Sequence, residues 1–364
     1  MSNRVIGEES DTRTNGGRGS RASSLAIALA IVWLGTGCIS IDLFGGGAGA
    51  PLVETVVRGD EGPKILLLDI DGIISGADMA PSLLGFRTMS MVARVREVLD
   101  RARADEDVQG VLLRIDSPGG TATASEQIYT EILRFKTERN IPVVAQLLTT
   151  AASGGYYIAM AADSVQAHPT TVTGSIGVIF SSVNFAGLME KVGIEDQTIT
   201  AGEFKDAGSP FRRLTDEERS QLQSIVDDLY ARFRDIVVLG RPELDREQVN
   251  VLANGRIYSA PQALENGLVD KIGTIEDAVG MIERQLGVSS SRVVAYHRPR
   301  EQRRNLYTRA MPALPFSTGR GAALGGQGAV NPERLAMIGL EDLLRRPGFH
   351  YLWWPGLLSV GAGR

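Results

Sequence analysis

The sequence predicts a layered α/β domain built on a largely parallel sheet. Between about residues 63 and 287, short aliphatic runs of buried-strand type alternate with stretches that have the apolar spacing of amphipathic helices. This alternation is typical of helices packed against a parallel sheet. The strand–turn–helix pattern is not duplicated along the chain, so we expect one such unit.

The composition excludes several classes of site. Hydrophobic residues make up 43% and charged residues 22% of the 364 residues, which indicates a globular protein. A net charge of −5 argues against nucleic-acid binding through overall charge. The single cysteine, Cys38, cannot form an intrachain disulfide or a cysteine-based zinc site. Only three histidines are present, so a histidine-rich metal site is not expected.

Residues 1–50 predict a signal or membrane-anchor segment. Arginines precede an uncharged apolar run, only Asp42 is charged between Ala22 and Phe44, and a glycine-rich linker follows. A secretory signal and an uncleaved membrane helix both fit this pattern, and a buried core helix is the plainer alternative. The preceding arginines favour an orientation that places the rest of the chain outside the cytoplasm.

Cys38 adds a further possibility to this segment. Small residues before a lone cysteine resemble a bacterial lipoprotein signal, although Gly35 stands where a bulky aliphatic residue is usual. A lipid anchor, a transmembrane anchor and an inert apolar thiol therefore all stay open.

Each element of the α/β region has its own sequence signal. Aliphatic runs predict strands, apolar residues at helical spacing predict helices, and Thr215 with Glu218 predicts a capping box at the start of the longest helix. In chain order we expect strand 64–70, helix 89–104, strand 110–115, helix 124–138, strand 141–147, helix 153–162 and helix 215–239.

The C-terminal region is predicted to be irregular. Residues 298–331 are rich in Arg, Gly and Pro and have the composition of a linker, and residues 332–346 could form a short amphipathic helix. The aromatic tail, residues 351–358, holds two of the three tryptophans. It could dock on a neighbouring subunit, in a substrate groove or at a membrane interface, or pack on its own domain.

Two glycine-rich turns are candidates for chemistry. The first, Asp116–Gly120 (DSPGG), follows an aliphatic strand, and its glycines leave backbone amides free to stabilise an oxyanion. Taken alone, such a turn is more often purely structural. The second, residues 151–157 (AASGGYY), places Ser153 between a strand and a helix among small neighbours, as in a nucleophile elbow. A plain helix-capping role for Ser153 is the alternative.

A nucleophilic serine needs a base. The histidines are poorly placed: His168 lies close to Ser153 in sequence at a predicted strand end, and His297 and His350 lie at or beyond the edge of the domain. A lysine acts as a base only as the neutral amine, and burial can lower the pKa of a lysine by several units. Of five lysines, Lys205 alone lies in a loop punctuated by Gly and Pro, while an ion pair with Asp206 remains the alternative.

A resemblance distinguishes among these candidates. The motifs GVLLRIDSPGG, TTAASGGYYIAMAAD, VTGSIGV, TAGEFKDAGSPFR and GRIYSAPQALENGLVDKIG, in this order over about residues 63–285, resemble the signal peptide peptidase A (protease IV) family. The resemblance implies that Ser153 is the nucleophile and Lys205 the general base. It implies an oxyanion hole formed by Gly120 and Gly154, with Gly119 supporting the turn.

The same resemblance implies a fold, an assembly and a substrate class. It implies the Clp protease/crotonase-like α/β fold over residues 60–290, after the anchor segment 1–50 and before an irregular tail, 291–364. It also suggests that Ser175 orients Lys205. Short, single-unit relatives form ring-like oligomers that bring serine and lysine together across a subunit boundary. The implied function is a membrane-anchored, extracytoplasmic serine endopeptidase that degrades residual signal peptides and other apolar peptides, without metal or cofactor.

Two other functions fit the same fold. A crotonase-like acyl-CoA enzyme would use similar oxyanion glycines but would need no serine–lysine pair. A non-catalytic assembly protein would keep the peptide groove alone. A third possibility concerns only the base: His168 could act in place of Lys205.

Overall fold

The computed structural model describes residues 50–78, 89–299, 301, 303–308 and 349–352, all within one compact unit. The predicted anchor with Cys38, the predicted helix 332–346 and the tail from Trp353 onward lie outside the described residues. Among the helices that are described, none is both long and apolar enough to span a bilayer.

A mixed sheet with a parallel centre confirms the predicted α/β class. Its seven main strands, in order across the sheet, are β1 (Val53–Arg58), β11 (Arg292–His297), β2 (Lys64–Asp71), β3 (Val108–Ser117), β5 (Val143–Ala152), β6 (Ser164–Ala167) and β10 (Lys271–Ile272). Every pairing among them is parallel except that of β1 with β11. The sheet thus includes β11, which follows the predicted domain boundary at residue 290.

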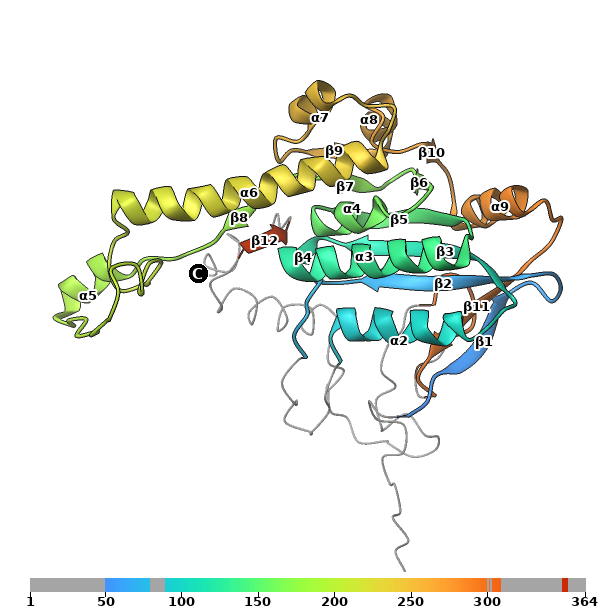
Figure 1. Cartoon of the computed structure of the whole chain (residues 1–364), viewed down its shortest axis with the longest axis horizontal. Helices are drawn as coiled ribbons and strands as arrows, with labels where there is room; N and C mark the ends of the chain where they lie inside the picture. Colours follow the sequence, from blue (N-terminus) through green and yellow to red (C-terminus); the bar gives the residue numbers. More distant parts are fainter. Residues whose placement is uncertain (1–49, 79–88, 300, 302, 309–348, 353–364) are drawn as a thin grey trace, which may run out of the picture. The chain divides into compact units, whose positions relative to one another are not determined.

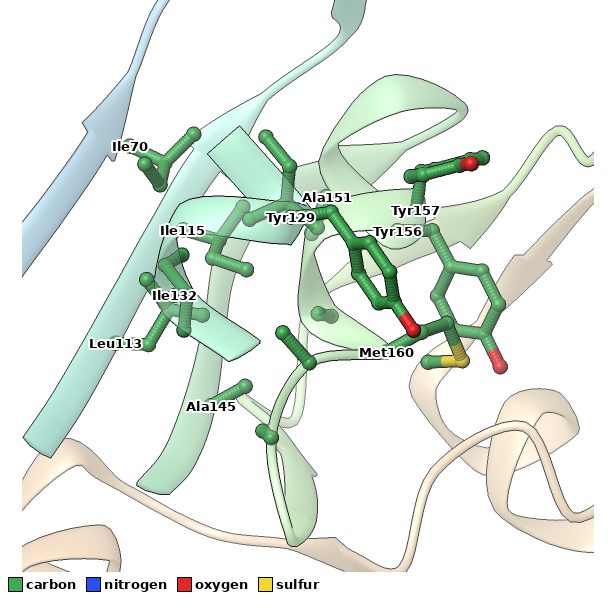
Figure 2. Close-up of a cluster of buried hydrophobic side chains, with 14 of the residues drawn as sticks. Ile70, Leu113, Ile115, Tyr129, Ile132, Ala145, Ala151, Tyr156, Tyr157 and Met160 are labelled. Atoms are coloured by element: carbon green, nitrogen blue, oxygen red, sulfur yellow. The ribbon is translucent and has the colours of Figure 1, made fainter. Parts of the chain in front are cut away.

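Helices cover both faces of this sheet, because successive side chains of a strand point to opposite faces. Leu66 and Leu68 of β2 join the core under α2 (Met91–Arg103) and α3 (Ala122–Arg139) (Figure 1). The intervening Ile65 and Leu67 pack with α9 (Ile275–Leu286). Figure 2 shows the larger core, in which Ile115 of β3 and Ile132 of α3 lie in one cluster.

Most predicted elements are found within a few residues of their predicted bounds. The long helix is α6 (Asp216–Gly240), and its capping box is confirmed: Glu218 N donates to the Thr215 hydroxyl, and Thr215 N donates to the Glu218 carboxylate. The helix after Ser153 is shorter than expected, α4 (Gly154–Ala159). The remaining described helices are α5 (Ala186–Val192), α7 (Arg246–Leu252) and α8 (Ala260–Glu265).

Two further strands continue the sheet beside the last residues of β5. There β7 (Val172–Gly174) pairs with β5 in parallel, and β9 (Ile257–Ser259) pairs with β7 in antiparallel. Since β5 ends one residue before Ser153, this extension brings the 174–175 segment next to the candidate nucleophile.

A small second sheet was not predicted. It consists of β4 (Gly119–Thr121), β12 (Phe349–Leu352) and β8 (Ile179–Phe180), with β12 in the middle and antiparallel to both neighbours. The described part of the aromatic tail therefore packs on its own domain, directly against the first glycine-rich turn.

Candidate active site

Ser153 lies in a strained backbone conformation at the junction of β5 and α4. Its φ of 53° and ψ of −115° lie in a region that side chains other than glycine seldom adopt. Its side chain is not a helix cap, so the capping interpretation is wrong. Its N–H donates to Gly174 O at 2.7 Å, and the residue is only 1% exposed. Strain of this kind is concentrated at functional sites, where the surrounding structure holds it in place.

This strain predicts a difference between two inactivating substitutions. Ser153→Gly relieves the positive φ, whereas Ser153→Ala removes the same hydroxyl and keeps the strain. We expect the glycine variant to be more stable than the alanine variant by about 1 kcal/mol, because the relief exceeds the entropy cost of a glycine. Urea unfolding measures both variants. An alanine variant that equals or exceeds the glycine variant in stability would contradict the strain.

The first glycine-rich turn meets the start of α4. The Asp116 carboxylate accepts a hydrogen bond from Thr150 N at 3.0 Å, which ties the turn to the end of β5. Gly119 has a φ of +103°, and a methyl group on it would lie 2.8 Å from Gly154 N. Only glycines allow this approach of the two backbones.

A peptide carbonyl lies at this meeting point. Strand β12 places Tyr351 opposite Gly120. Its carbonyl oxygen is 1.9 Å from the position of a methyl on Gly119 and 3.2 Å from that of a methyl on Gly154. The carbonyl of an extended peptide segment therefore lies against Gly119, which was expected to support the turn, and against Gly154, the residue after Ser153, while Gly120 is its register partner across the two strands.

The Tyr351 side chain fills an aromatic pocket. Its ring stacks on Tyr157 at 5.2 Å between centroids and lies 4.8 Å from Phe233. Its hydroxyl donates to Leu229 O at 2.9 Å, and burial raises the pKa of this phenol. Arg232 of α6 binds Glu126 of α3 at 2.7 Å and so holds the two helices beside the pocket together. The pocket accepts a flat apolar side chain with one hydroxyl at its far end.

Ser175 directly follows β7, which pairs with β5, the strand that ends just before Ser153. Gly174 is paired with Ala152 across β5 and β7, so the two serines follow adjacent strand positions. Ser175 also has a positive φ, 51°, and is 8% exposed. Among the described residues it makes no hydrogen bond to Lys205, so its predicted orienting role stays a prediction.

Lys205 makes no hydrogen bond to Ser153 among the described residues. It is exposed, and no ion pair or side-chain hydrogen bond connects it to another described residue. The suggested ion pair with Asp206 is wrong, because Asp206 instead binds Arg212, with contacts of 2.6 and 2.7 Å. The chain thus brings together Ser153, the three glycines and Ser175, but not the predicted base.

The histidines occupy other positions. His168 lies just after β6, where its ring bonds the Thr170 hydroxyl at 2.9 Å. His297 bonds Thr55 across β11 and β1. His350 does not lie at the edge of the domain: it is buried within β12, where burial lowers its pKa.

Sequence reasoning did not find the pocket that holds Tyr351. Its walls come from α4 and α6, which are far apart along the chain, and helical spacing gives Phe233 the pattern of an ordinary core residue. The only available signal was Tyr157, the second tyrosine after Ser153, because it is the last residue of the AASGGYY motif.

Comparisons with known proteins identify the family of this chain. The family model described as peptidase family S49 matches residues 136–289. A protein of Enterococcus faecium named as a signal peptide peptidase SppA is 40% identical over 243 residues, which cover 67% of this chain and 70% of that relative. Protease 4 of Haemophilus influenzae is 33% identical over 61% of this chain, but only 34% of its own length is matched.

A plant protein shows the same likeness. The chloroplastic serine protease SPPA of Arabidopsis thaliana is 32% identical over 56% of this chain and 29% of its own length. Both glycine-rich turns and the buried serine thus belong to a chain whose relatives carry peptidase names. The chain is a serine peptidase and belongs to peptidase family S49, the family of signal peptide peptidase A.

Proposed function

We propose that this protein hydrolyses apolar peptides, residual signal peptides among them, with Ser153 as nucleophile and Lys205 as general base. One observation carries the proposal: the carbonyl of Tyr351, in an extended segment, lies against Gly119 and against Gly154, the residue that directly follows Ser153, and Tyr351 pairs with Gly120. This is the position that the carbonyl of a scissile peptide bond must occupy for attack by the serine.

The chemistry follows from this placement. Lys205, as the free amine, takes the proton from the Ser153 hydroxyl as its oxygen attacks the carbonyl carbon. The amides of Gly120 and Gly154 stabilise the tetrahedral oxyanion, and removal of one such donor typically costs about 3–4 kcal/mol. Lys205 then protonates the leaving amine, and water hydrolyses the acyl-enzyme.

The tail also suggests how a substrate binds. A peptide in the place of β12 would add a strand between β4 and β8, so that its backbone supplies affinity and the aromatic pocket selects a side chain. Phe349 of the tail contacts Phe180 of β8 at 5.2 Å between rings. Side chains of such a peptide would therefore meet apolar surfaces on both sides of the groove.

If the tail and a substrate share one groove, they compete. Tyr351→Ala removes the side chain that anchors the tail and leaves the groove free. We expect the KM for a peptide with tyrosine before the scissile bond to fall about tenfold while kcat is unchanged, since tenfold corresponds to ~1.4 kcal/mol of tail binding. Tyr307→Ala, an exposed tyrosine outside the groove, is the control. An unchanged KM in Tyr351→Ala would show that the tail does not compete.

The missing base supports an assembly of several subunits. Lys205 lies on a segment whose apolar side chains are exposed, among them Leu188, Ile194 and Ile199, the last 98% exposed. Apolar surface of this extent favours burial against another chain. We therefore propose a homo-oligomeric ring in which the Lys205 segment of one subunit lies over the Ser153 site of the next.

The fold and location belong to the same proposal. A parallel sheet with helices on both faces and a serine at a strand–helix junction supports the Clp protease/crotonase-like fold. The basic and apolar pattern of residues 1–50 supports a membrane anchor, with the peptidase domain on the extracytoplasmic side.

The test is covalent labelling of the full-length assembled protein with a serine-reactive acylating probe, followed by mapping of the modified residue. We expect the acyl group on Ser153 and no labelling in Ser153→Ala. Labelling at another serine would show that Ser153 is not the nucleophile, and no labelling while peptide binding persists would favour a non-catalytic peptide-binding protein.

A further inference from the structure

The segment that carries Lys205 is a series of tight turns. Lys205 N donates to Gly202 O at 3.2 Å, and Ser209 N donates to Asp206 O at 2.9 Å. Gly202 and Gly208 both have positive φ. Such turns hold few buried contacts of their own, so another contact must define where the lysine points.

That contact is a guanidinium shared between two carboxylates. Arg212 donates to both oxygens of Asp206, at 2.6 and 2.7 Å, and also to both oxygens of Glu218, one of them at 2.8 Å. Glu218 is itself part of the capping box of α6, and its side chain is 3% exposed. Arg212 therefore fastens the turn with Lys205 to the first turn of the longest helix.

The electrostatics of the cluster agree with its geometry. Hydrogen bonds from Arg212 lower the pKa of Glu218 to about 2 and also lower the pKa of Asp206. Both carboxylates therefore stay ionised at neutral pH. The Asp206 charge, adjacent to Lys205 in the chain, is directed at Arg212 and not at the lysine.

We propose that Arg212 is a positioning residue: it fixes the Lys205 turn on α6 and keeps the Asp206 carboxylate away from the amine. This inference rests on the proposed role of Lys205 as the base. Without Arg212, the freed carboxylate would pair with Lys205 and stabilise its ammonium form, because an opposite charge nearby favours the charged state. Less free amine would then be present at neutral pH.

Other charged residues also lie around the turn. The hollow beside it is lined by Glu203, Arg213 and Glu217 in addition to the cluster. The other segment bonded to the turn, residues 182–185, carries no charge; it is joined through Ser182 to Gly208 O and through Phe185 N to Pro210 O. Asp206 is the carboxylate next to Lys205 that Arg212 holds.

The test is the pH dependence of kcat/KM for the full-length assembled protein on a fluorogenic peptide with tyrosine before the scissile bond. In Arg212→Gln we expect the acidic limb of the pH profile of kcat/KM to move to higher pH by about one unit. At pH 7 kcat/KM should then be roughly tenfold below that of the wild type, and this difference should become smaller as the pH rises. The double variant Asp206→Asn/Arg212→Gln should return the limb to its wild-type position, because no carboxylate is freed.

Two outcomes would overturn the inference: a loss that is equal at every pH, or a shift that the second substitution does not reverse. If Arg212→Gln fails to assemble, as sedimentation would show, Arg212→Lys with and without Asp206→Asn repeats the test. Lysine keeps the charge but lacks the planar fork, so a smaller shift in the same direction is expected. Lys205→Ala separates the two proposals: if it remains active, the proposed base is wrong; if it is inactive while Arg212→Gln shows no shift, only the role of Arg212 fails.

Discussion

Ser153→Ala and Lys205→Ala should each lower kcat for peptide hydrolysis by about 10⁴-fold or more. When two residues act as one catalytic unit, removing either of them costs about as much activity as removing both. The physical reason is that a serine hydroxyl without a base is a poor nucleophile, and a base without the hydroxyl has no group to activate. Turnover of a fluorogenic peptide by the assembled variants measures the loss. Binding of an uncleavable peptide should be retained in both, because neither side chain forms the groove.

Mixing the two variants provides the sharpest control. Ser153 and Lys205 do not contact each other within one described chain, so the proposed site combines the serine of one subunit with the lysine of the next. Co-assembled Ser153→Ala and Lys205→Ala subunits should regain activity, because some boundaries then hold both intact residues. Activity that stays absent in verified mixed assemblies would indicate a site formed within one chain. Full activity of Lys205→Ala alone, with loss in His168→Ala, would instead make His168 the base.

Gly119→Ala should lower kcat/KM by about 10²- to 10³-fold, the effect of losing an oxyanion contact. A methyl group there would lie 1.9 Å from the Tyr351 carbonyl oxygen and 2.8 Å from Gly154 N. It would therefore occupy the space that the scissile carbonyl needs. The same substitution should also weaken docking of the tail, since β12 pairs with β4 at this residue.

Backbone strain is the competing explanation for this loss, and Gly72→Ala controls for it. Gly72 has a φ of +83°, comparable with the +103° of Gly119, but a methyl group on it would meet nothing within 4 Å. Both variants should lose stability, as urea unfolding would show, but only Gly119→Ala should lose catalysis at a temperature where both are folded. Equal loss of activity in the two variants would attribute the effect to strain.

Local patterns sufficed for the α/β class and for half of the site. The aliphatic runs of β2, β3 and β5 mark a buried parallel sheet because both faces of each strand are covered, and the capping box of α6 is visible as Thr215 and Glu218. The SPGG and SGG motifs marked the two turns that meet at the Tyr351 carbonyl, because glycines at strand ends leave backbone amides accessible, although such turns are more often purely structural. Resemblance to a family then singled out Lys205 among five lysines.

The tertiary structure decided what depends on distant segments. Several features of the site depend on residues that are separated by many positions in the chain. These features are the strained φ of Ser153, the aromatic pocket of Tyr157 and Phe233, and the placement of β12 between β4 and β8. No periodicity encodes such contacts. Even a contact over a short stretch of chain needed the structure: Lys205, next to Asp206, was the candidate partner, but Arg212, six positions further on, binds Asp206 and Glu218 at once with its planar fork. Which charged groups pair depends on their distance and geometry in the folded protein, whereas the sequence gives only their order along the chain.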